Sequence, residues 1–329
     1  MSLLVSVCLA VFLGPADPER PTVLVVLGTP GTPEYGVAFQ SWTTRWRDAA
    51  SKGGADFVVI GATKPEGIDK SPEPVITDHD RLRDFLVDRA RTNPPGPLWL
   101  VLIGHGSFDG RAAKFNLRGP DCTDTELAGW LKPITSSVAI LDCSSSSGPF
   151  LSKLSGPDRV VVTATKSGQE QNYARLGQYL AEAWTNPHAD LDKDGQTSLL
   201  EAFLIAGKQT ADFYKAKAQL STEHALIDDN ADGKGTPADW FEGIRLTRKA
   251  QGGTAADGLK ANQLHLIRNE RDRRIAPDLI RRRNELELQL AALRDRKSTL
   301  GEDEYYCQLE ELMVQLARTY DRSPEGHGH

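Results

Sequence analysis

Residues 98–107 read Leu-Trp-Leu-Val-Leu-Ile-Gly-His-Gly-Ser, an unbroken apolar run that ends at a histidine between two glycines. An apolar run of this length without alternation is typical of a parallel strand that is buried on both faces. Four more short runs rich in β-branched residues occur at residues 23–27, 57–60, 138–141 and 160–164. The five runs predict a parallel sheet, with residues 98–103 as a central strand.

Helical patterns fill the segments between these runs. Aromatic residues at helical spacing occur at Phe39, Trp42 and Trp46, and an amphipathic run covers residues 80–90. A capping box is formed by Thr123 with Glu126, and a helical pattern over residues 173–184 follows the last strand. Strands that alternate with helices in this way predict an α/β fold with a doubly wound, mostly parallel sheet.

The composition changes beyond about residue 249. A glycine-rich stretch over 252–258 is typical of a linker, and charged, helical sequence follows it. Two apolar stripes run along the predicted helices over 278–296 and 303–320, and they consist of Leu286, Leu290 and Leu293 and of Leu309, Leu312 and Leu316. We therefore expect a sheet domain over 21–248 and a C-terminal helical hairpin over 259–322. The hairpin is expected to share few contacts with the sheet domain, and it offers a means of self-association.

The charge and the first residues bear on partners and location. A net charge of -6 gives no basic excess, so we expect no nucleic-acid partner. Residues 3–13 are almost wholly apolar and small residues follow them, which predicts a signal peptide over 1–16 and export to the periplasm or outside the cell. A cytoplasmic location is expected if this segment is not a signal peptide. The run is too short to cross a bilayer, and no other segment resembles a membrane span.

Three loops follow the carboxyl ends of predicted strands, where open α/β sheets place their chemistry. The loop over 28–36 lacks the Gly-Lys-Ser/Thr ending of a P-loop, so it does not predict nucleotide binding. In the loop over 104–110, His105 is the one histidine of 7 at the end of a predicted central strand. The third loop reads Asp142-Cys-Ser-Ser-Ser-Ser-Gly148. A thiol and four hydroxyls therefore lie beside His105 if the two strands are neighbours.

This joint pattern resembles the clan CD cysteine peptidases, which include the caspases, and it is most similar to the legumain-type family. The resemblance covers about residues 23–240 and rests on an apolar run before His-Gly and a second before an acidic residue, Cys and Ser-Gly. It implies a caspase-like fold and a cysteine endopeptidase that acts on a peptide or protein substrate. It also implies that His105 is the general base and acid, that Cys143 is the nucleophile and that Gly106 helps to bind the oxyanion.

The spacing around the cysteine departs from the family pattern, which places the cysteine two residues after the acid and three before the glycine. Here Cys143 lies one residue after Asp142 and five before Gly148. Counted from Asp142, the place of the nucleophile falls on Ser144, and counted back from Gly148 it falls on Ser145. Two functions stay open: a thiol peptidase, and a catalytically inactive caspase-like module that binds a peptide or a protein partner.

Residues 190–201 match the twelve-residue EF-hand loop at every ligand position. The expected ligands are Asp190, Asp192, Asp194, the carbonyl of Gln196, Ser198 and Glu201. A single loop within the sheet domain predicts a structural Ca²⁺ ion rather than a switch.

A second, weaker loop starts the same way, and its ligand positions are Asp228, Asn230, Asp232, Lys234 and Asp239. Pro237 and the short closing Asp239 depart from the pattern. We therefore expect lower affinity there, with a plain turn as the alternative.

Overall fold

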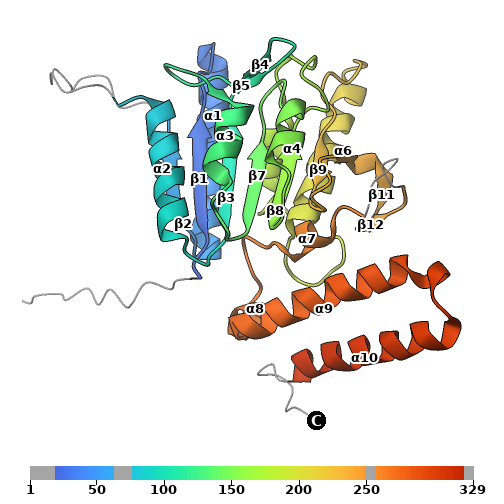
Figure 1. Cartoon of the computed structure of the whole chain (residues 1–329). Helices are drawn as coiled ribbons and strands as arrows, with labels where there is room; N and C mark the ends of the chain where they lie inside the picture. Colours follow the sequence, from blue (N-terminus) through green and yellow to red (C-terminus); the bar gives the residue numbers. More distant parts are fainter. Residues whose placement is uncertain (1–18, 63–75, 249–255, 322–329) are drawn as a thin grey trace, which may run out of the picture.

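The computed structural model describes residues 19–62, 76–248 and 256–321. The signal peptide predicted over 1–16 and most of the linker predicted over 252–258 lie outside these residues. The fold is α/β, with helices on both faces of a mostly parallel seven-stranded sheet (Figure 1). None of the helices in the described ranges combines the length and the apolar character that crossing a membrane requires.

The five predicted strands form the parallel part of the sheet, and each agrees with its predicted range to within one residue at either end. They are β1 (Thr22–Leu27), β2 (Asp56–Ile60), β3 (Leu98–Ile103), β7 (Val138–Asp142) and β8 (Arg159–Thr163). The strand order is β10-β9-β8-β7-β3-β1-β2, so β3 lies in the middle, between β1 and β7. β9 (Leu226–Asp228) and β10 (Thr236–Pro237) extend the sheet in antiparallel fashion. They are too short to show a strand period in the sequence.

Within the described residues, six helices cover the two faces of the sheet. The side chains of α1 (Pro33–Gly53), α5 (Leu176–Ala183) and α6 (Leu199–Ala216) share one buried cluster with β1, β3, β7 and β8. The second cluster, on the opposite face, contains α2 (Asp78–Thr92), α3 (Asp124–Leu131) and α4 (Gly148–Leu154). The capping box of Thr123 and Glu126 is present at the start of α3, as the sequence predicts.

A small antiparallel sheet that the sequence analysis missed follows β3 directly. It consists of β4 (Gly106–Phe108), β5 (Ala113–Phe115) and β6 (Cys122–Thr123). A Cβ atom on Gly28 would lie 2.5 Å from the carbonyl oxygen of Asn116, and one on Gly104 would lie 3.1 Å from the Phe115 ring. Glycine at these two strand ends therefore makes room for β5.

The C-terminal region consists of helices, of which the two longest lie antiparallel at the end of the sheet where the parallel strands begin (Figure 1). The helices are α7 (Leu259–Gln263), α8 (Glu270–Arg274), α9 (Pro277–Asp295) and α10 (Glu302–Asp321). Leu286, Leu290 and Leu293 are buried, as their spacing predicts. α10 leaves Met313 and Val314 exposed.

The expectation of few contacts with the sheet domain is wrong for the first part of this region. Ala261 and Leu266 are buried in the same cluster as β1 and α1. A Cβ atom on Gly53, the last residue of α1, would lie 2.1 Å from the carbonyl oxygen of Leu266. The chain therefore adds to the sheet domain's core before it enters α9.

Candidate functional site at the carboxyl ends of the central strands

His105 lies where the winding of the sheet reverses. β3 has β1 on one side and β7 on the other, and the loops after these three parallel strands lie at the same edge of the sheet. The Nε2 atom of His105 is 3.1 Å from the carbonyl oxygen of Pro30, in the loop after β1. The backbone carbonyl of His105 accepts a hydrogen bond from the N–H of Asn116. The predicted adjacency of the His105 loop and the Asp142 loop is confirmed, since β3 and β7 are paired.

Three aromatic rings surround the imidazole of His105. Its ring centroid lies 5.2 Å from that of Tyr35, 5.7 Å from that of Phe39 and 6.1 Å from that of Tyr173. Tyr35 and Tyr173 stack on each other at 4.3 Å, and the Arg175 guanidinium lies over the Tyr173 ring. His105, Tyr35 and Tyr173 are partly exposed, so this aromatic cluster forms a surface patch.

The Cys143 side chain is part of the hydrophobic core. It is 1% exposed and belongs to the cluster between the sheet and α1. Its Sγ donates to the carbonyl oxygen of Leu141 at 3.7 Å. Burial, together with the Asp142 carboxylate, raises the pKa of the thiol. Across the described residues, no hydrogen bond joins the Cys143 sulfur to His105.

The hydroxyls of Ser144 and Ser145 form hydrogen bonds with neighbouring groups of the protein. Ser144 Oγ donates to Asp142 Oδ1 at 2.6 Å. Ser145 Oγ accepts from the Gly106 N–H at 3.1 Å and is also 3.1 Å from the Gly106 carbonyl oxygen, to which it donates. Both serines are buried. The N–H that the resemblance assigns to oxyanion binding is therefore occupied by a hydroxyl of the protein itself.

Asp142 is fully buried at the end of β7. Desolvation raises its pKa to about 7, although the hydrogen bonds from the Ser144 hydroxyl and N–H act in the opposite direction. Its Oδ2 atom has no hydrogen-bond partner among the described residues. The sequence motif uses Asp142 only as the reference position from which the nucleophile is located. The sequence signal for its raised pKa is an acidic residue directly after an apolar strand, where burial is expected.

We expect Asp142→Asn to flatten the pH dependence of stability. An unfolded Asp titrates near pH 3.9, whereas folded Asp142 holds its proton up to about pH 7. Above both pKa values the folded state has lost this proton and the full destabilisation is present. The free energy of unfolding of the wild type should therefore fall between about pH 4 and pH 7, by on the order of 4 kcal/mol.

Urea unfolding of wild type and Asp142→Asn at about pH 5 and pH 8, with saturating calcium, measures this difference. Asp212→Asn, at an exposed position, serves as the control and should keep the wild-type slope. An Asp142→Asn slope equal to that of the wild type would contradict the assignment.

The first predicted calcium loop connects α5 to α6, at the end of the sheet opposite His105. Carboxylate oxygens of Asp190, Asp192 and Asp194 lie within 4.8 Å of one another. Asp190 Oδ1 is buried and has no hydrogen-bond partner in the described part of the chain. Glu201 Oε1 accepts from the N–H groups of Leu191 and Asp192, at 2.6 and 3.2 Å. The three aspartates thus gather carboxylate oxygens around one point, as a hard cation requires, while Glu201 is outside this group and bonds to backbone N–H groups of the loop.

This loop also bonds to the C-terminal region. The Gln196 side chain accepts from the N–H of Asn269 at 3.1 Å and donates to Asp272 Oδ2 at 3.3 Å. Asp272 in turn forms an ion pair with Arg283 of α9 at 3.0 Å. Ser198, at the ninth position of the loop, forms an isolated β-bridge with His265. Gln196, expected to bind through its backbone, thus also links the loop to α8 through its side chain.

The second predicted loop follows β9. Asp228 is buried, and the N–H of Gly233 donates to Asp228 Oδ2 at 3.0 Å. The N–H of Lys234 donates to Asp232 Oδ1, and that of Asp232 to Asn230 Oδ1, both at 2.8 Å.

The last predicted ligand of this loop lies elsewhere. Asp239 is exposed in the short 3-10 helix Ala238–Trp240. In the described part of the chain it makes no hydrogen bond with the other acids of the loop. The structure thus brings together Asp228, Asn230 and Asp232 and leaves Asp239 outside the group.

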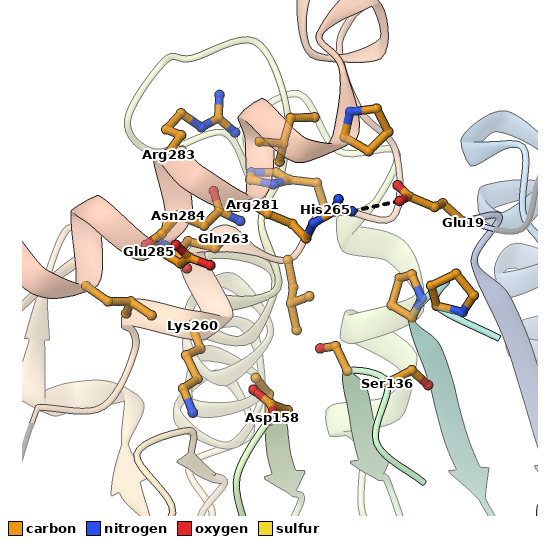
Figure 2. A pocket seen from close by; sticks show the side chains of 18 of the residues that line it. Glu19, Ser136, Asp158, Lys260, Gln263, His265, Arg281, Arg283, Asn284 and Glu285 are labelled. Atoms are coloured by element: carbon orange, nitrogen blue, oxygen red, sulfur yellow. Dashed lines mark hydrogen bonds and ion pairs between the residues drawn. The ribbon is translucent and has the colours of Figure 1, made fainter. Parts of the chain in front are cut away.

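A cavity of about 590 Å³ lies between the beginnings of the parallel strands and α9 (Figure 2). Ser136 and Asp158 line it from the sheet side, and His265 and Arg281 from the C-terminal side, with Arg281 paired to Glu19 at 2.7 Å. None of the site residues predicted from the sequence lines this cavity.

A scan against protein-family models finds no match to this chain, and no curated protein matches it either.

Proposed function

We propose that the chain is a catalytically inactive caspase-like module that binds a peptide or a protein partner and is stabilised by calcium. The observation that carries the proposal is the packing of Cys143. A thiol that is 1% exposed, donates to Leu141 and has a raised pKa offers little thiolate for attack. The Ser145 hydroxyl on the Gly106 N–H supports the same conclusion, because that donor is not free for an oxyanion.

The caspase-like part of the proposal is supported by the topology around His105. A mostly parallel sheet places the His-Gly loop of β3 beside the Asp-Cys-Ser loop of β7, on paired strands. Two sequence segments that the resemblance treats as partners are therefore neighbours in space.

Partner binding is proposed for the aromatic cluster of Tyr35, Phe39, His105 and Tyr173. Partly exposed tyrosines with an adjacent Arg175 are residue types that commonly anchor protein interfaces. The cluster lies at the carboxyl edge of the sheet, which is the usual place for ligands in open α/β folds.

Calcium binding is proposed for the loop over 190–201. Three carboxylates lie within 4.8 Å of one another, and one of their oxygens is buried without a hydrogen-bond partner in the residues that the structure describes. A bound cation would neutralise their repulsion and supply the missing partner. The ion would brace the junction of α5, α6 and α8, far from His105.

Alkylation of the native protein tests the proposal on catalysis. Cys307 is exposed, whereas Cys122 and Cys143 are buried, so the chain carries its own control. We expect iodoacetamide to label Cys307 rapidly and to leave Cys143 unlabelled until the protein is denatured, as read by peptide mass spectrometry. We also expect no cleavage of a peptide library in saturating calcium.

Labelling of Cys143 faster than Cys307, lost in His105→Ala, would overturn the proposal. Such a result would establish a working thiol dyad and a cysteine endopeptidase.

A further inference from the structure

We propose that the loop after β9 is a second calcium site, and that its closing carboxylate comes from Asp257, a residue 18 positions beyond the end of the loop pattern at Asp239. The inference extends the proposed calcium binding of the first loop to a site whose ligand set cannot be read from contiguous sequence.

The two loops have the same backbone form. The fourth residues, Lys193 and Ala231, have φ of 63° and 67°, and the sixth residues, Gly195 and Gly233, have φ of 89° and 71°. In both loops the N–H of the sixth residue donates to the first Asp, at 3.2 Å from Gly195 and 3.0 Å from Gly233. Equivalent oxygens at the first, third and fifth positions therefore point toward equivalent places.

Asp257 makes the hydrogen bonds in the second loop that Glu201 makes in the first. Glu201 Oε1 accepts from the N–H groups at the second and third positions of its loop. Asp257 Oδ1 accepts from the corresponding groups, those of Asp229 at 3.1 Å and Asn230 at 3.3 Å.

The correspondence extends to the second oxygen of each carboxylate. Glu201 Oε2 accepts from the hydroxyl of Ser198 at the ninth position, at 2.9 Å. Asp257 Oδ2 accepts from the hydroxyl of Thr236, also at the ninth position, at 2.5 Å. Asp257 thus occupies the place of the twelfth residue, which Asp239 leaves vacant.

The surroundings of the second loop point to a cation. Asp232 Oδ2 is buried and has no hydrogen-bond partner within the described structure. Asp228 is 1% exposed and Asp257 is 5% exposed. Buried carboxylates at such a spot are costly unless a positive charge neutralises them. An all-oxygen set of carboxylates, an amide and a backbone carbonyl suits Ca²⁺.

α7 joins the two sites. Asp229, inside the second loop, accepts from the N–H groups of Gly258 and Ala261 at the start of α7, at 2.9 and 2.8 Å. At the other end of α7, Asn262 accepts from the hydroxyl of Ser198 in the first loop at 3.1 Å. The segment that carries Asp257 is therefore held between the two loops, which explains how a residue so far along the chain reaches the site.

Calorimetric titration of the full, chelator-stripped chain with CaCl₂ tests the inference. We expect two ions per wild-type chain. Asp257→Asn should weaken one of them by about 10- to 100-fold, because a charged ligand is lost. Asp239→Asn is the matched control and should keep both ions at wild-type affinity. Glu201→Gln should weaken the other ion and leave the Asp257 site intact.

Asp232→Asn provides a second variant in case Asp257→Asn does not fold, as judged by circular dichroism. It should weaken the binding of the same ion as Asp257→Asn.

One result would overturn the inference while leaving the first loop's site in place. It is a wild-type chain that binds one ion, whose affinity falls in Glu201→Gln but not in Asp232→Asn or Asp257→Asn. A single ion whose affinity falls in Asp257→Asn but not in Glu201→Gln would support the inference and refute the site in the first loop. A loss of calcium affinity in Asp239→Asn but not in Asp257→Asn would also overturn the inference.

Discussion

Removal of calcium should lower the melting temperature, and Glu201→Gln should reduce the part of this lowering that is due to the first loop. An ion that binds the folded state alone, at a hundredfold excess over its dissociation constant, adds about 2.7 kcal/mol to the free energy of unfolding. Glu201 is the residue to change because its carboxylate closes the loop and is 1% exposed. An amide in its place loses the charge and one acceptor oxygen.

The measurement compares melting curves in calcium and in chelator for wild type and variant. Glu201→Gln also disturbs the capping box of α6, so its melting temperature in chelator will differ from that of the wild type. The calcium-dependent difference within each protein is therefore the quantity to compare. Asp192→Asn, at an exposed ligand position, should reduce the same difference with less change in the chelated state. Equal melting temperatures of the wild type in calcium and in chelator would contradict the proposed stabilisation by calcium.

Gly53→Ala and Gly129→Ala should change stability in opposite directions. A Cβ atom at Gly53 would lie 2.1 Å from the carbonyl oxygen of Leu266, which belongs to the backbone and cannot swing aside. We expect a loss of about 3 kcal/mol or more. Gly129 lies within α3 with open space around its Cβ position, so alanine there should stabilise by about 0.5 to 1 kcal/mol.

Urea unfolding curves of the two variants give the comparison. The prediction tests whether the segment around Leu266 belongs to the core of the sheet domain. Stabilisation of similar size in both variants would mean that this segment is not docked against α1, and the hairpin would then be a separate unit.

Much of the sheet could be predicted because its strands are buried on both faces. Such strands are apolar at every position, so residues 98–103 stand out without any knowledge of their partners. Neither strand by itself shows that β3 pairs with β7, and it is this pairing that makes His105 and the Asp142 loop neighbours. β9 and β10 carry too few residues to show a period, and their place depends on pairing with β8.

The candidate site was less predictable because it depends on the direction in which each side chain points. Backbone pairing continues past β7, since the N–H of Cys143 donates to the carbonyl oxygen of Leu102. Cys143 therefore points to the same face as Leu141, toward the core, while Ser145 reaches Gly106. The family motif gives only the number of residues between the acid and the glycine, so it does not show to which face of the sheet each side chain points.

Elements with local signals can be predicted from the amino-acid sequence without the fold: the apolar strands, the capping box at Thr123 and the first acidic loop with its Glu201. These depend on burial, on bonds within one helical turn or on ligands within twelve residues, so neighbouring residues suffice to define them. The burial of Cys143, the docking of Leu266 and the position of Asp257 depend on the packing of the whole fold. Each of these depends on groups far apart in the chain that meet only after the sheet and its helices have packed.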